Sequence, residues 1–345
     1  MSRKVLLSAN EAVAWAACKA GCAVASAYPG TPSTEILEQV AKFKDSIYCE
    51  WGVNEKVSME VAIGASIAGA RALTAMKHVG LNVAMDPLMT YTYVGANGGL
   101  VVVTADDPGM HSSQNEQDSR NLVKFARAAL FEPADSQETF DMVQAAFEVS
   151  EQFQVPAFVR LSTRTSHTST VVDVGDDFGP GYPERKEYVK DIRRYIPVPM
   201  FARPQRLKAQ ERTAALRAFA GETPFNRVER GDDRLGIITS GVTYQYVKEV
   251  FPEFSVLKLG FTNPLPIEQV KAFAASVERV LVIEELDPFL EDQVRALGIK
   301  VVEHATELNM HEMNPVRLTA LRKELLGDVE LPVVTRADAG LPTRP

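Results

Sequence analysis

The chain has 345 residues, of which 46% are hydrophobic, and this length exceeds what one hydrophobic core usually serves, so the sequence predicts two domains. The 37 lysines and arginines are scattered and outnumbered by 45 aspartates and glutamates, a formal net charge of -8 that argues against a nucleic-acid partner. No stretch approaches the roughly 20 apolar residues of a membrane span and no signal-peptide cleavage site is recognisable, so we expect no membrane association and a cytoplasmic location.

Residues 1–170 alternate predicted helices and strands. The predicted strands are short, rich in Val and Ala, and bounded by Gly, Pro or Asp, as buried parallel strands are. They cover residues 22–28, 46–51, 72–76, 98–107 and 156–162, with helices from residue 11, over 33–43 and after residue 54. The pattern predicts a doubly wound α/β domain, in which ligands bind beyond the carboxyl ends of the strands.

The rest of the chain divides into three parts. Residues 171–233 are charged and rich in Pro and Gly, with one helix-like piece over 205–220, and we interpret them as a connecting arm. Regular alternation resumes over 234–330, which predicts a second, smaller parallel α/β domain, and residues 331–345 read as a polar tail. Its predicted strands are 235–241, 255–260, 279–285 and 300–305, and its predicted helices are 244–251, 267–277 and 290–298.

Two segments that follow predicted strands carry candidate binding groups. AYPGTPSTE, residues 27–35, places Thr31, Ser33 and Thr34 at a helix N-terminus, which suits an anion such as a carboxylate. A plain helix cap explains the same residues. KHVGLNVAMDPL, residues 77–88, follows a predicted strand and puts His78 and Gly80 in one predicted turn. Two interpretations of this histidine are open, a structural role and a functional one.

ADDPGMHSSQNEQDSR, residues 105–120, forms a long polar loop between a hydrophobic strand and the next helix. Such a loop in a compact domain is usually functional or disordered, and because it is flanked by regular elements we favour a functional loop carrying His111 and Arg120. Two metal interpretations are open. One uses Asp106 and Asp107 with the histidine, and the other uses Cys18 and Cys22, while the role of Cys49 is undetermined.

The helix after Asn54 contains two glutamates and many small residues. Glu55 lies in its first turn and Glu60 about 140° further round, so the two carboxylates do not face one substrate. Glycine costs about 1 kcal/mol relative to alanine inside a helix, so Gly64 and Gly69 indicate a close approach by a second backbone or a flat ligand.

Long segments of the chain resemble the alpha subunits of indolepyruvate:ferredoxin oxidoreductases, a family within the thiamine diphosphate-dependent 2-oxoacid:ferredoxin oxidoreductase group. The matching segments are YPGTPSTEIL, EWGVNEKVSMEVAIGASIAGARALTAMKHVGLNVAMDPLM, ADDPGMHSSQNEQDSR and LGIITSGVTYQYVKEV. The resemblance implies that residues 1–170 form a pyrimidine-binding domain and that residues 234–330 form a domain similar to the C-terminal domain of transketolase.

The resemblance also assigns roles to residues. The family pattern places a glutamate nine residues before a glycine of a small-residue helix, where it hydrogen-bonds the cofactor pyrimidine, and Glu55 with Gly64 matches it. His78 and Gly80 would join Glu55 in cofactor binding. Thr31 inherits contact with the substrate carboxylate by position. The other expected substrate-binding residues are Ser33, His111 and Arg120.

The activity implied by the resemblance is oxidative decarboxylation of an aryl 2-oxoacid such as indolepyruvate to an acyl-CoA, with reduction of ferredoxin. Thiamine diphosphate would be shared with a partner chain or domain that binds its diphosphate. Ferredoxin-like domains and a gamma-type subunit would complete the complex, with magnesium and iron–sulfur clusters expected on partner chains only and no metal site here. The chain would be a fragment or one subunit of a split enzyme. The alternatives are a subunit of a split non-oxidative 2-oxoacid decarboxylase and a non-catalytic scaffold.

Overall fold

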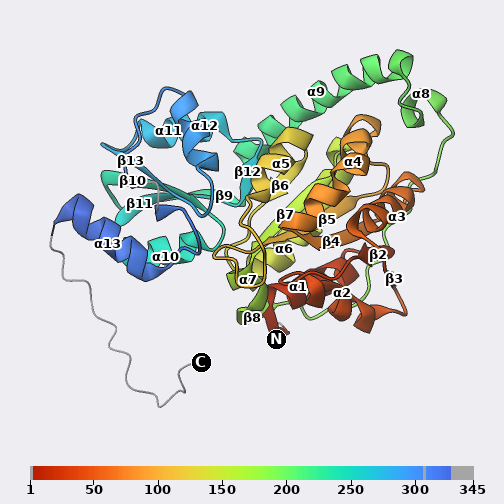
Figure 1. Ribbon diagram of the computed structural model, residues 1–345, viewed down its shortest axis with the longest axis horizontal. Helices are drawn as coiled ribbons and strands as arrows, with labels where there is room; N and C mark the ends of the chain where they lie inside the picture. The colour runs from red at the N-terminus through yellow and green to blue at the C-terminus, as the bar shows by residue number, and fades with distance from the viewer. Residues whose placement is uncertain (1–2, 306–307, 328–345) are drawn as a thin grey trace.

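The computed structural model describes residues 3–305 and 308–327, and the polar tail predicted over 331–345 lies outside them. Two α/β domains lie side by side, and a long helix runs along the top of the larger one (Figure 1). Each domain has one mainly parallel sheet with helices on both faces. The fold class predicted from the sequence is therefore confirmed.

The first domain is built on a seven-stranded sheet in the order β12-β6-β7-β5-β4-β2-β3. All pairs are parallel except the edge pair β12–β6, which is antiparallel. The strands are β2 (Val24–Ala27), β3 (Tyr48–Trp51), β4 (Ala72–Lys77), β5 (Leu100–Asp106), β6 (Ala129–Phe131), β7 (Ala157–Ser162) and β12 (Phe261–Asn263). Because β12 comes from residues beyond 234, the second domain supplies one edge strand of the first domain's sheet.

Helices cover this sheet on both faces because alternate residues of the buried strands point to opposite sides. Leu73 and Ala75 of β4 join the core formed with α1 (Ala9–Lys19), α2 (Thr34–Val40) and α6 (Ser136–Phe153). Ala72 and Met76 join the core formed with α3 (Glu55–Ile67), α4 (His78–Val94) and α5 (Ser119–Ala126). The remaining elements are η1 (Ala41–Phe43), α7 (Thr163–His167) and the antiparallel pair β1 (Lys4–Ser8) and β8 (Ser169–Asp173).

The second domain has a four-stranded sheet in the order β13-β10-β11-β9. Its elements are β9 (Asn226–Glu229), β10 (Asp232–Ser240), α10 (Thr243–Val250), β11 (Phe254–Leu259), α11 (Ile267–Ala274), β13 (Val280–Ile283), α12 (Phe289–Ala296) and α13 (Pro315–Leu326). The strand expected over 300–305 is wrong, because Val301 makes only an isolated bridge to Val280. Helix α13, which the sequence did not predict, covers one face together with α10.

Residues 171–233, predicted as a connecting arm, contain more regular structure than expected. They hold α8 (Ile192–Tyr195) and α9 (Pro199–Glu222), and β9 belongs to the second sheet. Before α8 the chain follows the amino edge of the first sheet, where the Lys186 amide donates to the Gly69 carbonyl at 3.2 Å. A Cβ on Gly69 would come within 1.6 Å of the Lys186 carbonyl oxygen, so this close backbone approach requires glycine.

Candidate active site

The candidate active site lies at the carboxyl edge of the first sheet. Strands β5, β4, β2 and β3 are adjacent and parallel, so the segments that follow them meet at one edge. These segments are the turn 28–33, the start of α3, the start of α4, and residues 107–118, hereafter the polar loop. They bring together four residues that the sequence singled out, namely Thr31, Glu55, His78 and Gly80.

Glu55 is the first residue of α3, and its half-buried carboxylate lies against Gly80 of α4. Asn54 caps the helix by accepting from the Val57 amide at 2.9 Å. A Cβ on Gly80 would lie 2.5 Å from Oε1 of Glu55, so a side chain there would occupy the carboxylate's place. Among the described residues the Glu55 carboxylate has no hydrogen-bond or ion-pair partner, which leaves both of its oxygens available to a ligand.

The small residues of α3 divide into two groups by what surrounds them. A Cβ on Gly64 would meet nothing within 4 Å, so the described chain itself does not require glycine there. Gly69, in contrast, is where the residue 186 backbone approaches. Glu60 is exposed on the helix surface. A close approach is therefore provided by the chain at Gly69, while the surface at Gly64 is open.

His78 is buried at the first position of α4. The turn predicted over 77–88 is wrong, because α4 begins directly at the end of β4 and continues past Gly80 and Pro87. His78 Nε2 lies 3.2 Å from the Asn115 carbonyl oxygen of the polar loop. Its Nδ1 atom is buried without a partner in the described structure, a costly state for a polar atom unless a ligand or water completes it.

In the turn 28–33, Thr31 is exposed and Ser33 is buried. Thr31 is exposed, and its carbonyl oxygen accepts from Ser112 Oγ of the polar loop at 3.2 Å. Ser33 is only 2% exposed, and its hydroxyl donates to the Gly30 carbonyl at 2.7 Å within the turn. Thr31 is therefore accessible to a substrate, whereas the Ser33 hydroxyl is already used to hold the turn together.

The polar loop is ordered around Asp107. Its carboxylate accepts from the amides of His111 and Ser112 and from the hydroxyls of Ser113 and Thr163, at 2.7 to 3.2 Å. Burial alone would raise the pKa of Asp107, but these hydrogen bonds outweigh it and lower the pKa below its ordinary value. Both Asp107 and Asp106, which pairs with Arg160 at 2.6 Å, are committed to the protein itself rather than placed as free metal ligands.

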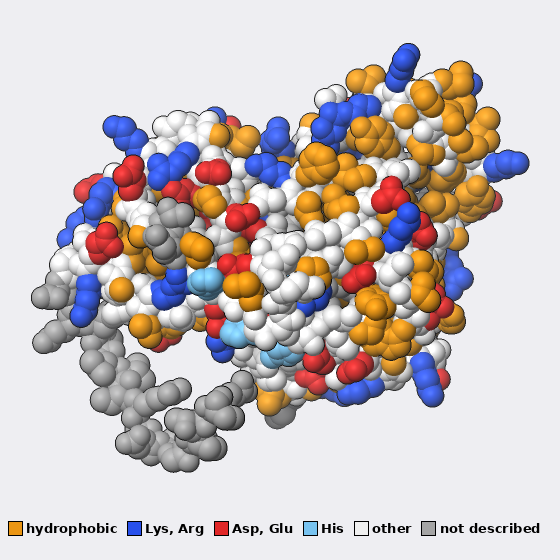
Figure 2. All heavy atoms as spheres, viewed as in Figure 1, with side chains coloured by type: hydrophobic (Ala, Val, Ile, Leu, Met, Phe, Trp, Pro, Cys, Tyr) orange, Lys and Arg blue, Asp and Glu red, His pale blue; other side chains and the backbone are white. Residues whose placement is uncertain are grey.

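His111 faces the second domain. It is half exposed, with Nε2 3.5 Å from Oε2 of Glu312, and His311 lies at the same distance from Glu116 of the polar loop. Figure 2 shows histidine side chains gathered where the two domains meet. His111 therefore belongs to the boundary between the polar loop and the second domain, and no described contact joins it to Glu55.

Arg120 is buried beneath the polar loop rather than facing an open site. Its guanidinium donates to Asp118 of the same loop and to Glu284 of the second domain, the latter at 2.8 Å. It also donates to the carbonyls of Glu285 and Asp287. The expected substrate-binding role does not match this position, because the guanidinium is committed to joining the two domains.

Lys77 is a residue at this edge that sequence reasoning missed. It ends β4, and its Nζ donates to the Ser112 carbonyl at 3.0 Å. Its methylenes pack on the turn 28–33, where a Cβ on Gly30 would lie 3.0 Å from Lys77 Cδ. The available signal was a lysine directly before His78 at the end of a predicted strand.

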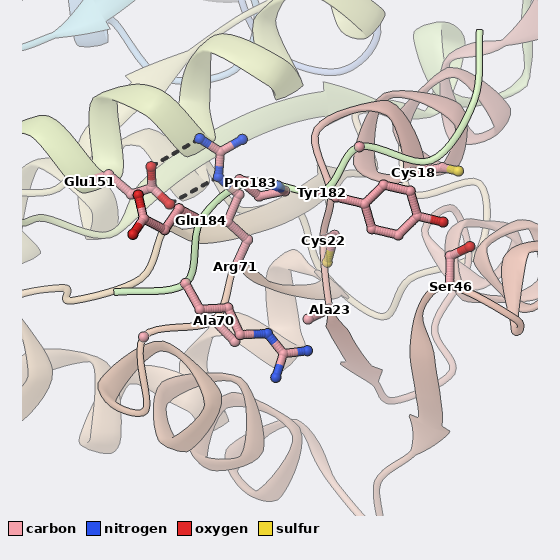
Figure 3. A pocket seen from close by; sticks show the side chains of 14 residues that line it. Cys18, Cys22, Ala23, Ser46, Ala70, Arg71, Glu151, Tyr182, Pro183 and Glu184 are labelled. Atoms are coloured by element: carbon pink, nitrogen blue, oxygen red, sulfur yellow. Dashed lines mark hydrogen bonds and ion pairs between the residues drawn. The ribbon is translucent and has the colours of Figure 1, made fainter. Parts of the chain in front are cut away.

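A cavity of about 160 Å³ lies at the opposite, amino edge of the sheet (Figure 3). Cys18 and Cys22 contribute to its lining, with their sulfur atoms turned in different directions. Burial raises the pKa of Cys18, and it raises that of Cys22 to about 12, so both thiols are protonated at neutral pH. The Arg71–Glu151 ion pair also borders the cavity. This chemistry does not favour the metal or redox pair considered from the sequence.

The fold is that of an α/β domain whose binding edge lies at the carboxyl ends of its parallel strands. Residues 15–211 match the model of the family "pyruvate flavodoxin/ferredoxin oxidoreductase, thiamine diphosphate-binding", and the chain belongs to this family. It is 42% identical to the indolepyruvate oxidoreductase subunit IorA of Pyrococcus abyssi, over 96% of this chain and 53% of that protein. The same subunit of Methanothermobacter thermautotrophicus is 45% identical, over 86% of this chain and 49% of that protein. The chain thus spans about half the length of these relatives.

Solved structures share the fold. A 2-oxoglutarate:ferredoxin oxidoreductase from Magnetococcus marinus, solved with 2-oxoglutarate, coenzyme A and succinyl-CoA bound, matches with a TM-score of 0.78. That match covers 94% of this chain and 65% of the other, at 19% identity. A split-gene transketolase in an inactive beta4 tetramer matches with a TM-score of 0.59, over 92% of this chain and 98% of that one. The similarity includes both domains, as the resemblance to a transketolase C-terminal domain implies.

Proposed function

We propose that this chain supplies the pyrimidine-binding half of a thiamine diphosphate site in a 2-oxoacid:ferredoxin oxidoreductase. The single observation that carries the proposal is the unpartnered Glu55 carboxylate held against Gly80 at the carboxyl edge of the sheet. The proposed reaction is oxidative decarboxylation of an aryl 2-oxoacid such as indolepyruvate, giving an acyl-CoA and carbon dioxide and reducing ferredoxin.

Two features of the edge fit a pyrimidine ring. The free Glu55 carboxylate suits a ring nitrogen, and Gly80 leaves the space that this carboxylate occupies. Gly64 faces open space, but nine residues at 100° each place it on the opposite face of α3 from Glu55, so one ring does not contact both. The buried and unpartnered Nδ1 of His78 supplies a further polar contact at the same edge. Glu55, His78 and Gly80 are therefore our proposed cofactor-binding residues.

Thiamine diphosphate, when bound, supplies the carbon nucleophile that decarboxylation of a 2-oxoacid requires. Glu55 would share a proton with a pyrimidine nitrogen through its carboxylate, and a half-buried position strengthens such a hydrogen bond. Thr31 would bind the substrate carboxylate from the turn 28–33. The polar loop, held by Asp107, would cover the edge and limit the access of water.

A separate chain or domain would bind the diphosphate with magnesium, and ferredoxin-like and gamma-type partners would carry the electrons through iron–sulfur clusters. An exposed apolar surface supports a partner. Figure 2 shows hydrophobic side chains gathered around the α8–α9 corner, where Met200 is 70% exposed. Met85, Met89 and Phe125 line an adjoining groove of about 620 Å³. Because α4 runs from His78 at the site to this groove, we propose that the diphosphate-binding partner contacts it.

The proposed location is the cytoplasm. Over residues 3–305 and 308–327, no helix combines the length and apolar character needed to cross a membrane. Cys18, Cys22 and Cys49 are all free thiols, as expected in a reducing compartment. Activity of the complex in a cell extract containing reduced glutathione would agree with this location.

Two alternatives predict different products or no role in chemistry. A split non-oxidative decarboxylase would release an aldehyde and leave ferredoxin oxidised. A scaffold subunit would tolerate loss of the Glu55 carboxylate. The oxidoreductase is favoured because the family match and the relatives' names both specify an oxidoreductase.

The test is reconstitution of the complex with the partner chains that copurify from the native source. Glu55→Gln should keep the fold but lower turnover of indolepyruvate by about 10²- to 10⁴-fold, the usual range for loss of a group that handles a proton. Glu60→Gln is the matched control, because it changes an exposed carboxylate of the same helix and should leave turnover unchanged.

Full activity of the Glu55→Gln complex would contradict the catalytic proposal and favour a scaffold. Aldehyde production without ferredoxin reduction by the wild-type complex would favour the non-oxidative decarboxylase. Binding of thiamine diphosphate, followed by calorimetry, separates loss of the cofactor from loss of proton transfer.

A further inference from the structure

Lys77 differs from the other buried cations of the described chain because it has no carboxylate partner there. The remaining buried lysines and arginines each form an ion pair with a carboxylate. They are Arg120 with Asp118, Arg160 with Asp106, Lys258 with Glu138, and Arg322 with Glu253. Lys77 is 8% exposed, and among the described residues no carboxylate lies within ion-pair distance of its ammonium.

Within the described part of the chain, the Lys77 ammonium makes one hydrogen bond, which leaves most of its donors free. An ammonium group has three N–H donors, and one of them reaches the Ser112 carbonyl at 3.0 Å. Asp107 of the same loop is occupied by amide and hydroxyl donors of four residues of its own surroundings. A buried charge without a counter-ion is unfavourable, so this position calls for an anion from outside the described chain.

The position of Lys77 identifies where that anion would bind. Its methylenes pack on Gly30 in the turn 28–33, and its Nζ contacts Ser112 of the polar loop. The Ser112 hydroxyl donates to the carbonyl oxygen of Thr31, so one residue bridges Lys77 and Thr31. The ammonium therefore lies between the two segments that border the proposed substrate-binding place.

We propose that Lys77 binds the carboxylate of the 2-oxoacid substrate and so selects an anionic substrate, an inference that rests on the proposed function. One ammonium matches the single negative charge of a monocarboxylate, whereas the diphosphate of the cofactor carries several charges together with a metal ion. Arg120, the cation that the sequence favoured for substrate binding, is committed to Glu284. Lys77 therefore has the substrate-binding role that was expected of Arg120.

The experiment uses the reconstituted complex with indolepyruvate as the substrate and its methyl ester as an uncharged competitive inhibitor. Lys77→Met should raise KM for indolepyruvate about 10- to 100-fold, the range for a lost charged hydrogen bond, while the inhibition constant of the ester stays the same. Lys77→Arg should recover part of the affinity. Lys271→Met, which removes an exposed cation of α11, is the control and should change neither constant.

The outcomes separate this inference from the proposed function. Turnover by the wild-type complex with an unchanged KM in Lys77→Met would overturn the inference alone. A loss of thiamine diphosphate affinity in Lys77→Met, with KM unchanged at saturating cofactor, would assign the lysine to the diphosphate and also overturn it. If the wild-type complex turns over no 2-oxoacid, the proposed function fails. Calorimetric binding of indolepyruvate to wild type and Lys77→Met then decides whether the lysine recognises a carboxylate.

Discussion

The guanidinium of Arg120 and the carboxylate of Glu284 join the two domains through a hydrogen bond of 2.8 Å in an environment where both side chains are almost fully buried. Glu284 also accepts from the amides of Leu290 and Glu291, so it holds the start of α12 as well. The pair connects the base of the polar loop to the second domain. The position of the second domain and the order of the loop are therefore linked.

Arg120→Met should destabilise the protein by about 3–5 kcal/mol, because it leaves the carboxylates of Asp118 and Glu284 buried without their cation. Urea unfolding measures this loss. The residual folded complex should retain the wild-type KM for indolepyruvate. A raised KM with unchanged stability would instead support the substrate-binding role predicted from the sequence.

Gly80→Ala should reduce cofactor binding more than stability. The added methyl group would meet Oε1, Cγ and Cδ of Glu55 at 2.5 to 2.9 Å, and these atoms belong to a flexible side chain that can swing away. We expect unfolding by urea to change little, while the affinity for thiamine diphosphate and the turnover fall at least tenfold. Wild-type turnover in this variant would mean that the position of Glu55 beside α4 is unimportant.

Gly64→Ala should change the stability more than it changes cofactor binding. Because a Cβ there has open space, the isolated chain should gain about 1 kcal/mol from better helix propensity. Binding of thiamine diphosphate by the complex should stay unchanged, because Gly64 lies on the opposite face of α3 from Glu55. Thermal unfolding of the isolated chain and calorimetry on the complex measure the two effects, and weakened binding would show that the cofactor approaches α3 at Gly64.

Glu285 should make the stability depend on pH. Burial raises its pKa from the ordinary value of 4.5 to about 7, so between these values the folded protein holds a proton that the unfolded chain releases. The stabilisation is present below pH 4.5 and is lost as the pH rises through 7, by roughly 3 kcal/mol at most. Glu285→Gln cannot lose this proton, so its stability relative to wild type should increase from pH 5 to pH 8 in urea titrations. A constant difference would contradict the burial of this group.

Asp107→Ala should release the polar loop. The substitution removes acceptors for four residues, and hydrogen bonds to a charged group contribute about 1.5–3 kcal/mol each. Hydrogen exchange at the amides of residues 109–118 should therefore accelerate by more than tenfold. Ser113→Ala, which removes one donor only, is the control. In wild type the protection should persist to pH 5, because the pKa of Asp107 is lowered and the carboxylate stays charged there.

Much of the fold was predictable because its central strands carry local signals. Strands β2, β4, β5 and β7 are short runs rich in Ala, Val and other apolar residues, and β3 lies in the short predicted strand 46–51 that Gly52 ends. Strands β1, β6, β8, β9 and β12 were missed, because they are short or exposed and depend on partners far away in sequence. The start of α4 was taken for a turn because Gly80 favours turns in isolation, and only its contact with Glu55 explains it within a helix.

The site was predictable where a residue's role follows from its place at the carboxyl edge of the sheet. Thr31 and His78 were singled out because they follow predicted strands, whereas the resemblance to the family chose Glu55 over Glu60, and all three residues lie at one edge. Arg120 and Ser33 were selected by the chemistry of their side chains, but burial and local partners decide what those groups can reach. Lys77 was overlooked for the complementary reason, because a missing counter-ion is visible only in three dimensions.

The edge strand β12 has a consequence for how this gene could be divided. Residues 261–263, well inside the second domain, complete the first domain's sheet beside β6, and Asn263 donates to the Ala128 carbonyl at 2.7 Å. A gene cut near residue 233 would therefore encode a sheet with an exposed edge and a second product with an unpaired segment. Recombination between related genes should preserve the two domains as one inherited block.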